Sequence, residues 1–185
     1  LLGSLLGTES PLTITQMLWV NLIMDTFAAG ALASLPPNER VMKDKPRRSG
    51  KDGDFIITRP MAYNIFGVGF AFVVILMGLL FYFHAQDGLT PHDLSWFFSF
   101  FVMLQFWNMF NAKAFMEGRS AFANLKDSKS FLLVALLILI GQYLIVTFGG
   151  EMFSVIPLPL EDWAIIIGSS SLVLWIGELF RLFKR

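Results

Sequence analysis

Residues 131–148 have the sequence FLLVALLILIGQYLIVTF, in which no side chain is charged. A helix of this length rises about 27 Å, close to the thickness of the ~30 Å hydrocarbon core of a bilayer. The glycine pair Gly149-Gly150 follows at once and favours an end to the helix. The stretch therefore predicts a transmembrane helix.

Four other apolar blocks of similar length lie along the chain. Pro36 and Pro37, which cannot continue a helix, end the first block, and Pro60 stands before the second. Together the blocks predict an all-α, polytopic transmembrane helical bundle with five full spans, preceded by the end of an earlier helix at residues 1–7. The expected spans are about 12–35, 61–83, 94–112, 131–148 and 163–180.

The overall composition supports a membrane protein. Hydrophobic residues make up 55% of the chain and charged residues 15%, whereas a soluble domain carries about a quarter charged residues. The lipid bilayer is therefore the expected partner. A formal net charge of zero gives no reason to expect nucleic acid, and the absence of cysteine excludes disulfides and thiolate metal sites.

Basic residues predict the orientation of the spans. All 14 Lys and Arg residues fall in two loops and the C-terminal tail. The loops on the other side of the predicted spans contain acidic residues but no Lys or Arg. Because Lys and Arg accumulate on the cytoplasmic side, we expect both loops and the C-terminus in the cytosol of a multi-pass integral membrane protein. The segments are 40–59, 113–129 and 181–185.

One acid lies well inside a predicted span. Asp25 is near the middle of the first span, and Asn21, four residues earlier, shares its face of the helix. Acids at this depth are costly and usually serve function, and carboxylate and amide oxygens suit Ca²⁺ or another hard cation. Two donors are too few for Ca²⁺, so other ligands would come from backbone carbonyls and absent helices. The alternative is an interhelical hydrogen-bonded pair.

Small residues follow the acid. The run Thr26-Phe27-Ala28-Ala29-Gly30-Ala31 allows close helix contacts, and Gly30 is expected to weaken the helix locally. A break in a membrane helix frees backbone carbonyls for ion coordination.

The third span carries a polar stripe of three amides, Gln105, Asn108 and Asn111. Hydrogen bonding between neighbouring helices is one interpretation, and an accessory ligand role for Gln105 or Asn108 is the other. Gln142 and the serines at 169–171 indicate packing and hydrogen bonding, and Glu178 is expected to snorkel or to pair with Arg181.

Other features concern the ends of spans and the absence of catalytic motifs. Trp19 lies toward a span end, where indole rings prefer the membrane interface. No phosphate-binding glycine loop, His/Cys metal cluster or nucleophile triad is present in the sequence. We therefore assign no catalytic residue and expect the chain to be inactive alone.

Residues 19–26, WVNLIMDT, followed by Pro36-Pro37, resemble the sixth membrane helix of calcium-transporting P-type ATPases, and most closely the plasma-membrane calcium pump subgroup. The resemblance continues to the end of the chain, through the basic loop around Pro46 and the segment from Gln105 to Asn111. It implies that residues 1–185 are the C-terminal transmembrane domain of such a pump, with helices six to ten. The start at Leu1 without methionine agrees with a piece of a longer protein.

The resemblance also implies a mechanism for the intact pump. Asn21 and Asp25 would bind Ca²⁺ as the transported ion, together with a Glu and backbone carbonyls of the fourth helix. ATP and Mg²⁺ would act in the cytosolic domains, which with helices one to five are the expected partners within the same pump. Ca²⁺ would leave the cytosol, and protons would return as counter-ions.

Departures from the two-calcium reticulum type refine this expectation. That type has Thr at the position of Met24 and Glu at the position of Gln105, so we expect one Ca²⁺ per cycle. Sodium pumps carry Asp at the position of Asn21, which argues against that branch. The lack of a long extension past Arg185 suggests no autoinhibitory tail, as expected of a prokaryotic pump in a bacterial inner or plasma membrane.

Two alternatives of other classes remain open from the sequence. A secondary cation/proton exchanger or channel could use Asp25 without ATP. A helical assembly module with no ion site would use the polar residues for packing alone.

Overall fold

The computed structural model describes residues 10–36, 57–87 and 89–183, and every regular element in these ranges is helical. The first span consists of α2, a π-helical segment η1 and α3. The elements are α2 (Ile14–Asn21), η1 (Leu22–Ala28), α3 (Ala29–Ala33), α4 (Arg59–Asp87), α5 (Pro91–Glu117), the short 3₁₀ turn η3 (Leu125–Asp127), α6 (Lys129–Phe148), α7 (Gly150–Phe153) and α8 (Leu160–Phe183).

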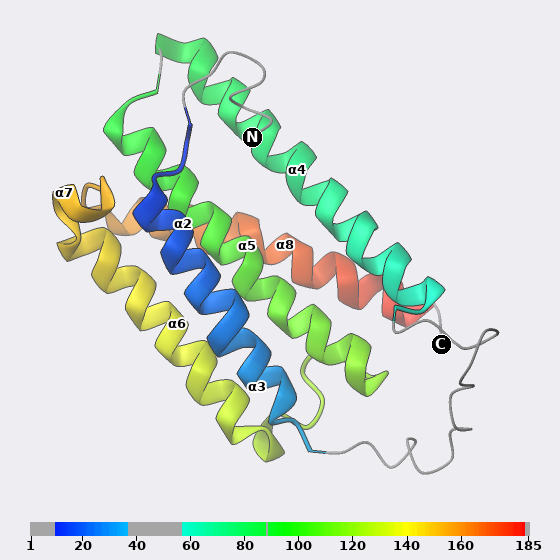
Figure 1. Cartoon of the computed structure of the whole chain (residues 1–185). Helices are drawn as coiled ribbons and strands as arrows, with labels where there is room; N and C mark the ends of the chain where they lie inside the picture. The colour runs from blue at the N-terminus through cyan, green and yellow to red at the C-terminus, as the bar shows by residue number, and fades with distance from the viewer. Residues whose placement is uncertain (1–9, 37–56, 88, 184–185) are drawn as a thin grey trace, which may run out of the picture.

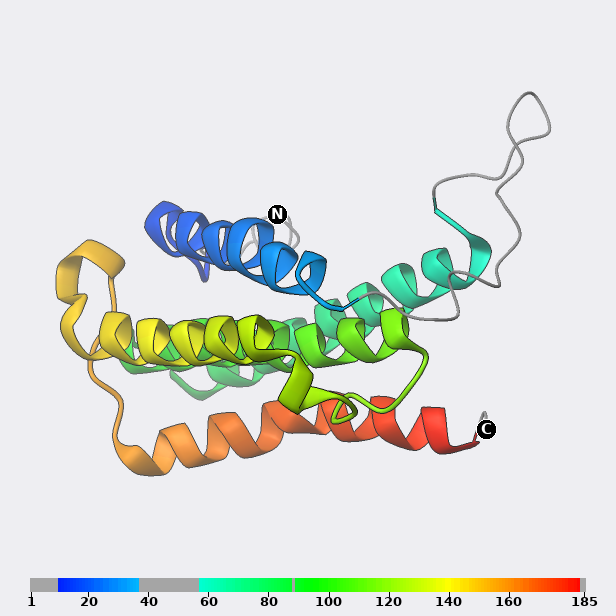
Figure 2. The same ribbon diagram turned by 90° about the horizontal axis from the view of Figure 1, so that it is seen from below.

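Helix α5 lies at the centre of the bundle (Figures 1 and 2). The first span lies against α6 on one side, and α8 packs along α5 on the opposite side. Helix α4 contacts the bundle through α5, and Phe72 and Leu80 are its buried side chains.

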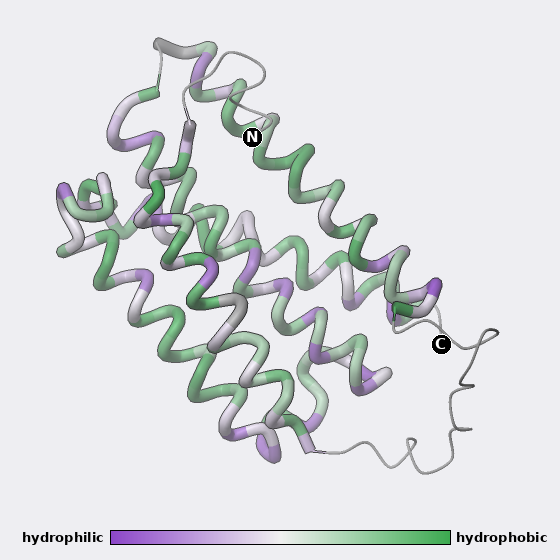
Figure 3. The backbone as a smooth tube through the Cα atoms, viewed as in Figure 1, coloured by the Kyte–Doolittle hydropathy of each residue, from purple (hydrophilic) through white to green (hydrophobic). Residues whose placement is uncertain are grey.

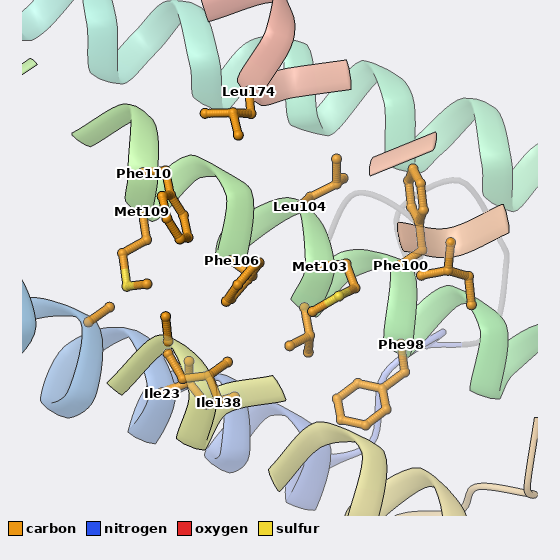
Figure 4. Close-up of a cluster of buried hydrophobic side chains, with 14 of the residues drawn as sticks. Ile23, Phe98, Phe100, Met103, Leu104, Phe106, Met109, Phe110, Ile138 and Leu174 are labelled. Atoms are coloured by element: carbon orange, nitrogen blue, oxygen red, sulfur yellow. The ribbon is translucent and has the colours of Figure 1, made fainter. Parts of the chain in front are cut away.

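The core consists of apolar side chains that α5 directs toward its neighbours. Phe98, Met103 and Leu104 of this helix are almost completely buried. Figure 4 shows them between the first span and α6 on one side and Leu174 of α8 on the other. Burial of these large side chains places α5 in the core, where it packs against α4, α6 and α8.

Local sequence explains where α5 begins and ends. Thr90 and Asp93 form a capping box in which each side chain accepts a hydrogen bond from the other's backbone N–H, and Pro91 occupies the first turn. The helix ends at Gly118, whose φ of 64° lies in the left-handed region that glycine tolerates. The helix is therefore longer at both ends than the 94–112 block.

Three helices in the described ranges are long and apolar enough to cross a membrane: α4 over Arg59–Ala85, α6 and α8. They confirm the blocks at 61–83, 131–148 and 163–180, with ends extended by a few residues. Figure 3 shows that α4 is hydrophobic along most of its length, and most of its large apolar side chains are exposed.

The other two expected spans differ from simple apolar helices. The first is divided into segments of 8, 7 and 5 residues because its middle adopts π geometry. Helix α5 has 27 residues but is less apolar, because it carries polar side chains that pack against its neighbours. The remnant helix expected at 1–7 and most of the basic loop 40–59 lie outside the described residues.

Candidate functional site

The first span combines a firmly capped start with a widened middle. Thr13 caps α2: its hydroxyl accepts from the backbone N–H of Gln16, whose side chain accepts from the backbone N–H of Thr13. From Leu22 to Ala28 the helix adopts π geometry. Such segments are rare in proteins, and those that occur are often at functional sites. The sequence placed the local weakness at Gly30, but Gly30 lies inside the regular α3 segment.

The two predicted ligands lie next to each other along this span. Asn21 is the last residue of α2 and its side chain is exposed. Asp25 is the middle residue of η1, so the widened segment is centred on the acid. The side chain of Asp25 lies outside the described part of the structure.

The accessory candidates belong to α5. Gln105 is half-buried and lines a small crevice with Val20 and Ile23 of the first span and Val102 of α5. The structure thus brings Gln105 beside the span that carries Asn21. Asn108 is also half-buried, one turn further along α5.

Helix α6 packs against η1 and α3, and side-chain hydrogen bonds attach the N-terminal half of the first span to α6 and α7. The indole N–H of Trp19 donates to Oε1 of Gln142 at 3.0 Å, and the Trp19 ring lies against Gly141. One turn earlier, Nε2 of Gln16 donates to the carbonyl of Phe153 at 2.8 Å. Gln16 and Gln142 are both buried. These contacts attach α2 to α6 and α7.

Polar side chains also join α5 to α8, which confirms the packing interpretation for two sequence positions. The indole N–H of Trp107 donates to the hydroxyl of Ser170 at 3.1 Å. Asn111 donates through Nδ2 to the carbonyl of Val173 at 3.0 Å and accepts from Arg181 at 2.8 Å. Hydrogen bonds between membrane helices of this kind contribute about 0.6–2 kcal/mol each.

Glu178 pairs with Arg181, as expected, at 2.8 Å. The same carboxylate oxygen accepts from the backbone N–H of Ala121 at 2.6 Å. Glu178 therefore also attaches the loop after α5 to the end of α8.

The sequence did not single out a second charged pair at the end of α5. Lys113 is completely buried, and its Nζ donates to Oε2 of Glu117 at 2.9 Å and to the carbonyl of Ala123 at 2.6 Å. The i, i+4 spacing of Lys113 and Glu117 was a visible signal for the pair. Burial of Lys113 could not be predicted from the sequence, because it depends on how the following loop folds back.

A close approach between α5 and α8 makes Gly177 sensitive to substitution. A Cβ at this position would lie 2.9 Å from Cγ of Asn111, inside van der Waals contact. We expect Gly177→Ala to destabilise the full-length protein by about 1–3 kcal/mol, because overpacking forces the helices apart. Thermal unfolding of the purified protein measures this change.

Gly168 in the same helix is the matched control for Gly177. A Cβ added there meets no atom within 4 Å. Gly168→Ala is therefore expected to leave stability unchanged or raise it by up to about 1 kcal/mol, since alanine is the better helix former. Equal melting temperatures for the two variants would contradict the close contact at Asn111.

The predicted metal ligands of the first span and α5 are carboxylate and amide side chains. Among the residues that the structure describes, no group of three or more His, Cys, Asp or Glu side chains could hold a metal ion.

Comparisons with known proteins agree with this membrane arrangement. A family model described as "Cation transporting ATPase, C-terminus" matches residues 9–183. Plasma membrane calcium-transporting ATPase 1 of Homo sapiens is 35% identical over 190 residues, which cover 96% of this chain and 15% of that protein. Plasma membrane calcium-transporting ATPase 2 of Oreochromis mossambicus is 36% identical over 184 residues, 92% of this chain and 16% of that protein.

The chain spans about 15% of the length of these relatives. The family model, in contrast, covers nearly all of it. The chain therefore belongs to the cation-transporting P-type ATPases, as their C-terminal membrane region, and is similar to the plasma membrane calcium-transporting ATPases.

Proposed function

We propose that this chain is the membrane-embedded C-terminal part of an ATP-driven calcium pump that exports Ca²⁺ from the cytosol. Asn21 and Asp25 contribute ligands to one intramembrane Ca²⁺ site. The observation that carries the proposal is the position of Asp25 at the centre of the π-helical segment, one turn after the exposed Asn21. An acid in a widened membrane helix is a costly arrangement that ion binding explains.

The rest of the site belongs to other parts of the pump. Asn21 is exposed in this chain, so its amide is accessible to a neighbouring helix outside residues 1–185. Ca²⁺ takes six to eight oxygens, which helices one to five and freed backbone carbonyls would complete. Gln105, beside Val20 and Ile23, is near enough to the first span to act as an accessory polar group.

Topology and counter-transport follow from the same proposal. The proposal includes five spans, counting the interrupted first span and α5, with the C-terminus and the basic loops in the cytosol because Lys and Arg accumulate on that side. In this proposal, protons return as counter-ions when Ca²⁺ leaves the site. ATP and Mg²⁺ act in cytosolic domains outside this chain.

ATP-driven uptake by the full-length protein tests the proposal. In sealed proteoliposomes we expect ⁴⁵Ca²⁺ accumulation that requires Mg²⁺-ATP, with about one Ca²⁺ bound per phosphorylated enzyme. Accumulation driven by an imposed proton gradient without ATP would instead identify a secondary exchanger. Two bound Ca²⁺ per phosphorylated enzyme would overturn the proposal of a single site but would remain consistent with an ATP-driven pump.

A further inference from the structure

The hydrogen bond between Trp19 and Gln142, here named the Trp19–Gln142 clasp, is placed at the boundary of the widened segment. The donor is the indole Nε1 of α2, the acceptor is Oε1 of α6, and the two atoms are 3.0 Å apart. The ring fits over Gly141, where even a Cβ would come within 2.9 Å of Trp19 Cη2. The clasp lies three residues before η1 begins at Leu22.

Two side-chain hydrogen bonds one turn apart fix the rotation of α2 about its own axis. Gln16 and Trp19 are three residues apart and therefore share a face of the helix. Gln16 donates to the carbonyl of Phe153, and Trp19 donates to Gln142. The two contacts along one face oppose rotation of α2, in addition to the packing of η1 and α3 against α6.

Rotation of α2 controls the direction of the Asn21 side chain. Successive residues of an α-helix are about 100° apart, so Asn21 lies about 200° around the helix from Trp19. Trp19 faces α6, and Asn21 is accordingly exposed on the far side. Any turn of α2 that loosens Trp19 moves Asn21 through the same angle.

The amide of Gln142 is an expensive way to hold two helices together. Gln142 is completely buried, and its Nε2 has no hydrogen-bond partner in the described part of the structure. An unsatisfied buried donor destabilises a fold, and an apolar side chain of similar size would avoid the cost. The amide of Gln142, unlike an apolar side chain, provides a hydrogen-bond acceptor for the Trp19 indole.

We infer that Trp19 and Gln142 are positioning residues of the cation site, which set its Ca²⁺ affinity by fixing the direction of Asn21. The inference rests on the proposed role of Asn21 as a ligand and adds a dependence on α6, a helix to which the proposed function assigns no ligand.

Equilibrium ⁴⁵Ca²⁺ binding to the full-length protein tests the inference through Trp19→Phe, which keeps an aromatic ring and removes the N–H donor. We expect the Kd to rise about 10-fold, as loss of an outer-shell partner does at other metal sites, with the number of sites per protein unchanged. A merely structural loss would lower the number of sites, because misfolded molecules bind no ion, and would leave the Kd of the rest unaltered.

Trp107→Phe is the matched control. It removes an indole hydrogen bond of similar length, to Ser170 at 3.1 Å, between α5 and α8. We expect its Kd to stay within about 2-fold of the unmodified protein. Equal Kd shifts in Trp19→Phe and Trp107→Phe, or none in Trp19→Phe, would overturn the positioning role.

Gln142→Leu approaches the clasp from the other helix and serves if Trp19→Phe does not accumulate. It should raise the Kd by the same factor as Trp19→Phe, and the double variant should show no further rise, because both changes remove one interaction. Additive shifts would contradict the clasp. Absence of Ca²⁺ binding in the unmodified protein would refute the proposed function itself. If the unmodified protein binds Ca²⁺ and the variants show the same Kd, only the positioning role is refuted.

Discussion

Asp25→Asn is expected to abolish high-affinity Ca²⁺ binding by the full-length protein, with a loss of at least about 100-fold in affinity, the upper end of what removal of an outer-shell partner costs a metal site. The substitution keeps the size of the side chain and one oxygen but removes the negative charge. A divalent ion in a membrane interior needs that charge, because Coulomb attraction is far stronger there than in water. Equilibrium ⁴⁵Ca²⁺ binding measures the change.

Glu151→Gln is the matched control for Asp25→Asn. Glu151 is an exposed carboxylate in α7, and its neutralisation should leave Ca²⁺ binding unchanged. Thermal stability of both variants is measured in parallel. Unaltered Ca²⁺ binding in Asp25→Asn would exclude Asp25 as a ligand. If its stability fell at the same time, the interhelical hydrogen-bonded pair would be the better interpretation.

Lys113→Met is expected to cost the full-length protein about 3–5 kcal/mol of stability, the usual result of removing one partner from a buried ion pair. The ammonium of Lys113 is fully buried and donates to Glu117 and to the carbonyl of Ala123. Methionine fills the space but offers no donor, so both acceptors lose a charged partner. The measurement is thermal unfolding of the purified protein, which we expect at a lower temperature in the variant.

Lys126 on the same connecting segment is the control for Lys113. It is exposed in the short turn η3, and Lys126→Met should change stability by less than about 0.5 kcal/mol. Equal unfolding temperatures for the two variants would show that the buried Lys113–Glu117 pair does not stabilise the attachment of the loop to α5. Partial recovery in Lys113→Met combined with Glu117→Gln is expected, because the second change removes the facing charge.

The helices were predictable because length and hydrophobicity alone are enough to identify a span. The blocks at 61–83, 131–148 and 163–180 contain the cores of α4, α6 and α8, and only their ends were misjudged. For α5 the sequence missed the first and last turns, and the last was missed because Lys113 was assigned to the basic loop that follows the span. The pairing of Lys113 with Glu117 and the fold of the following segment allow the helix to continue through both.

The candidate site was predictable only in part. Asp25 stood out because a charged residue inside an apolar block is rare, and Asn21 followed from the helical repeat. The position of the widened segment was not predictable from Gly30, since glycine lowers helix propensity but does not select π geometry. Trp19 carried a signal for the membrane interface, whereas the structure gives it a partner on α6.

By itself, the sequence determined that the chain is a set of apolar helices with a single acid deep inside one of them, because these properties depend on residues close together along the chain. Only the tertiary structure decided which helices hold the first span and which face of it stays open. Trp19 and Gln142 are 123 residues apart, and Asn111 and Arg181 are 70 apart. No local pattern encodes such pairs, because packing of the whole bundle brings them together.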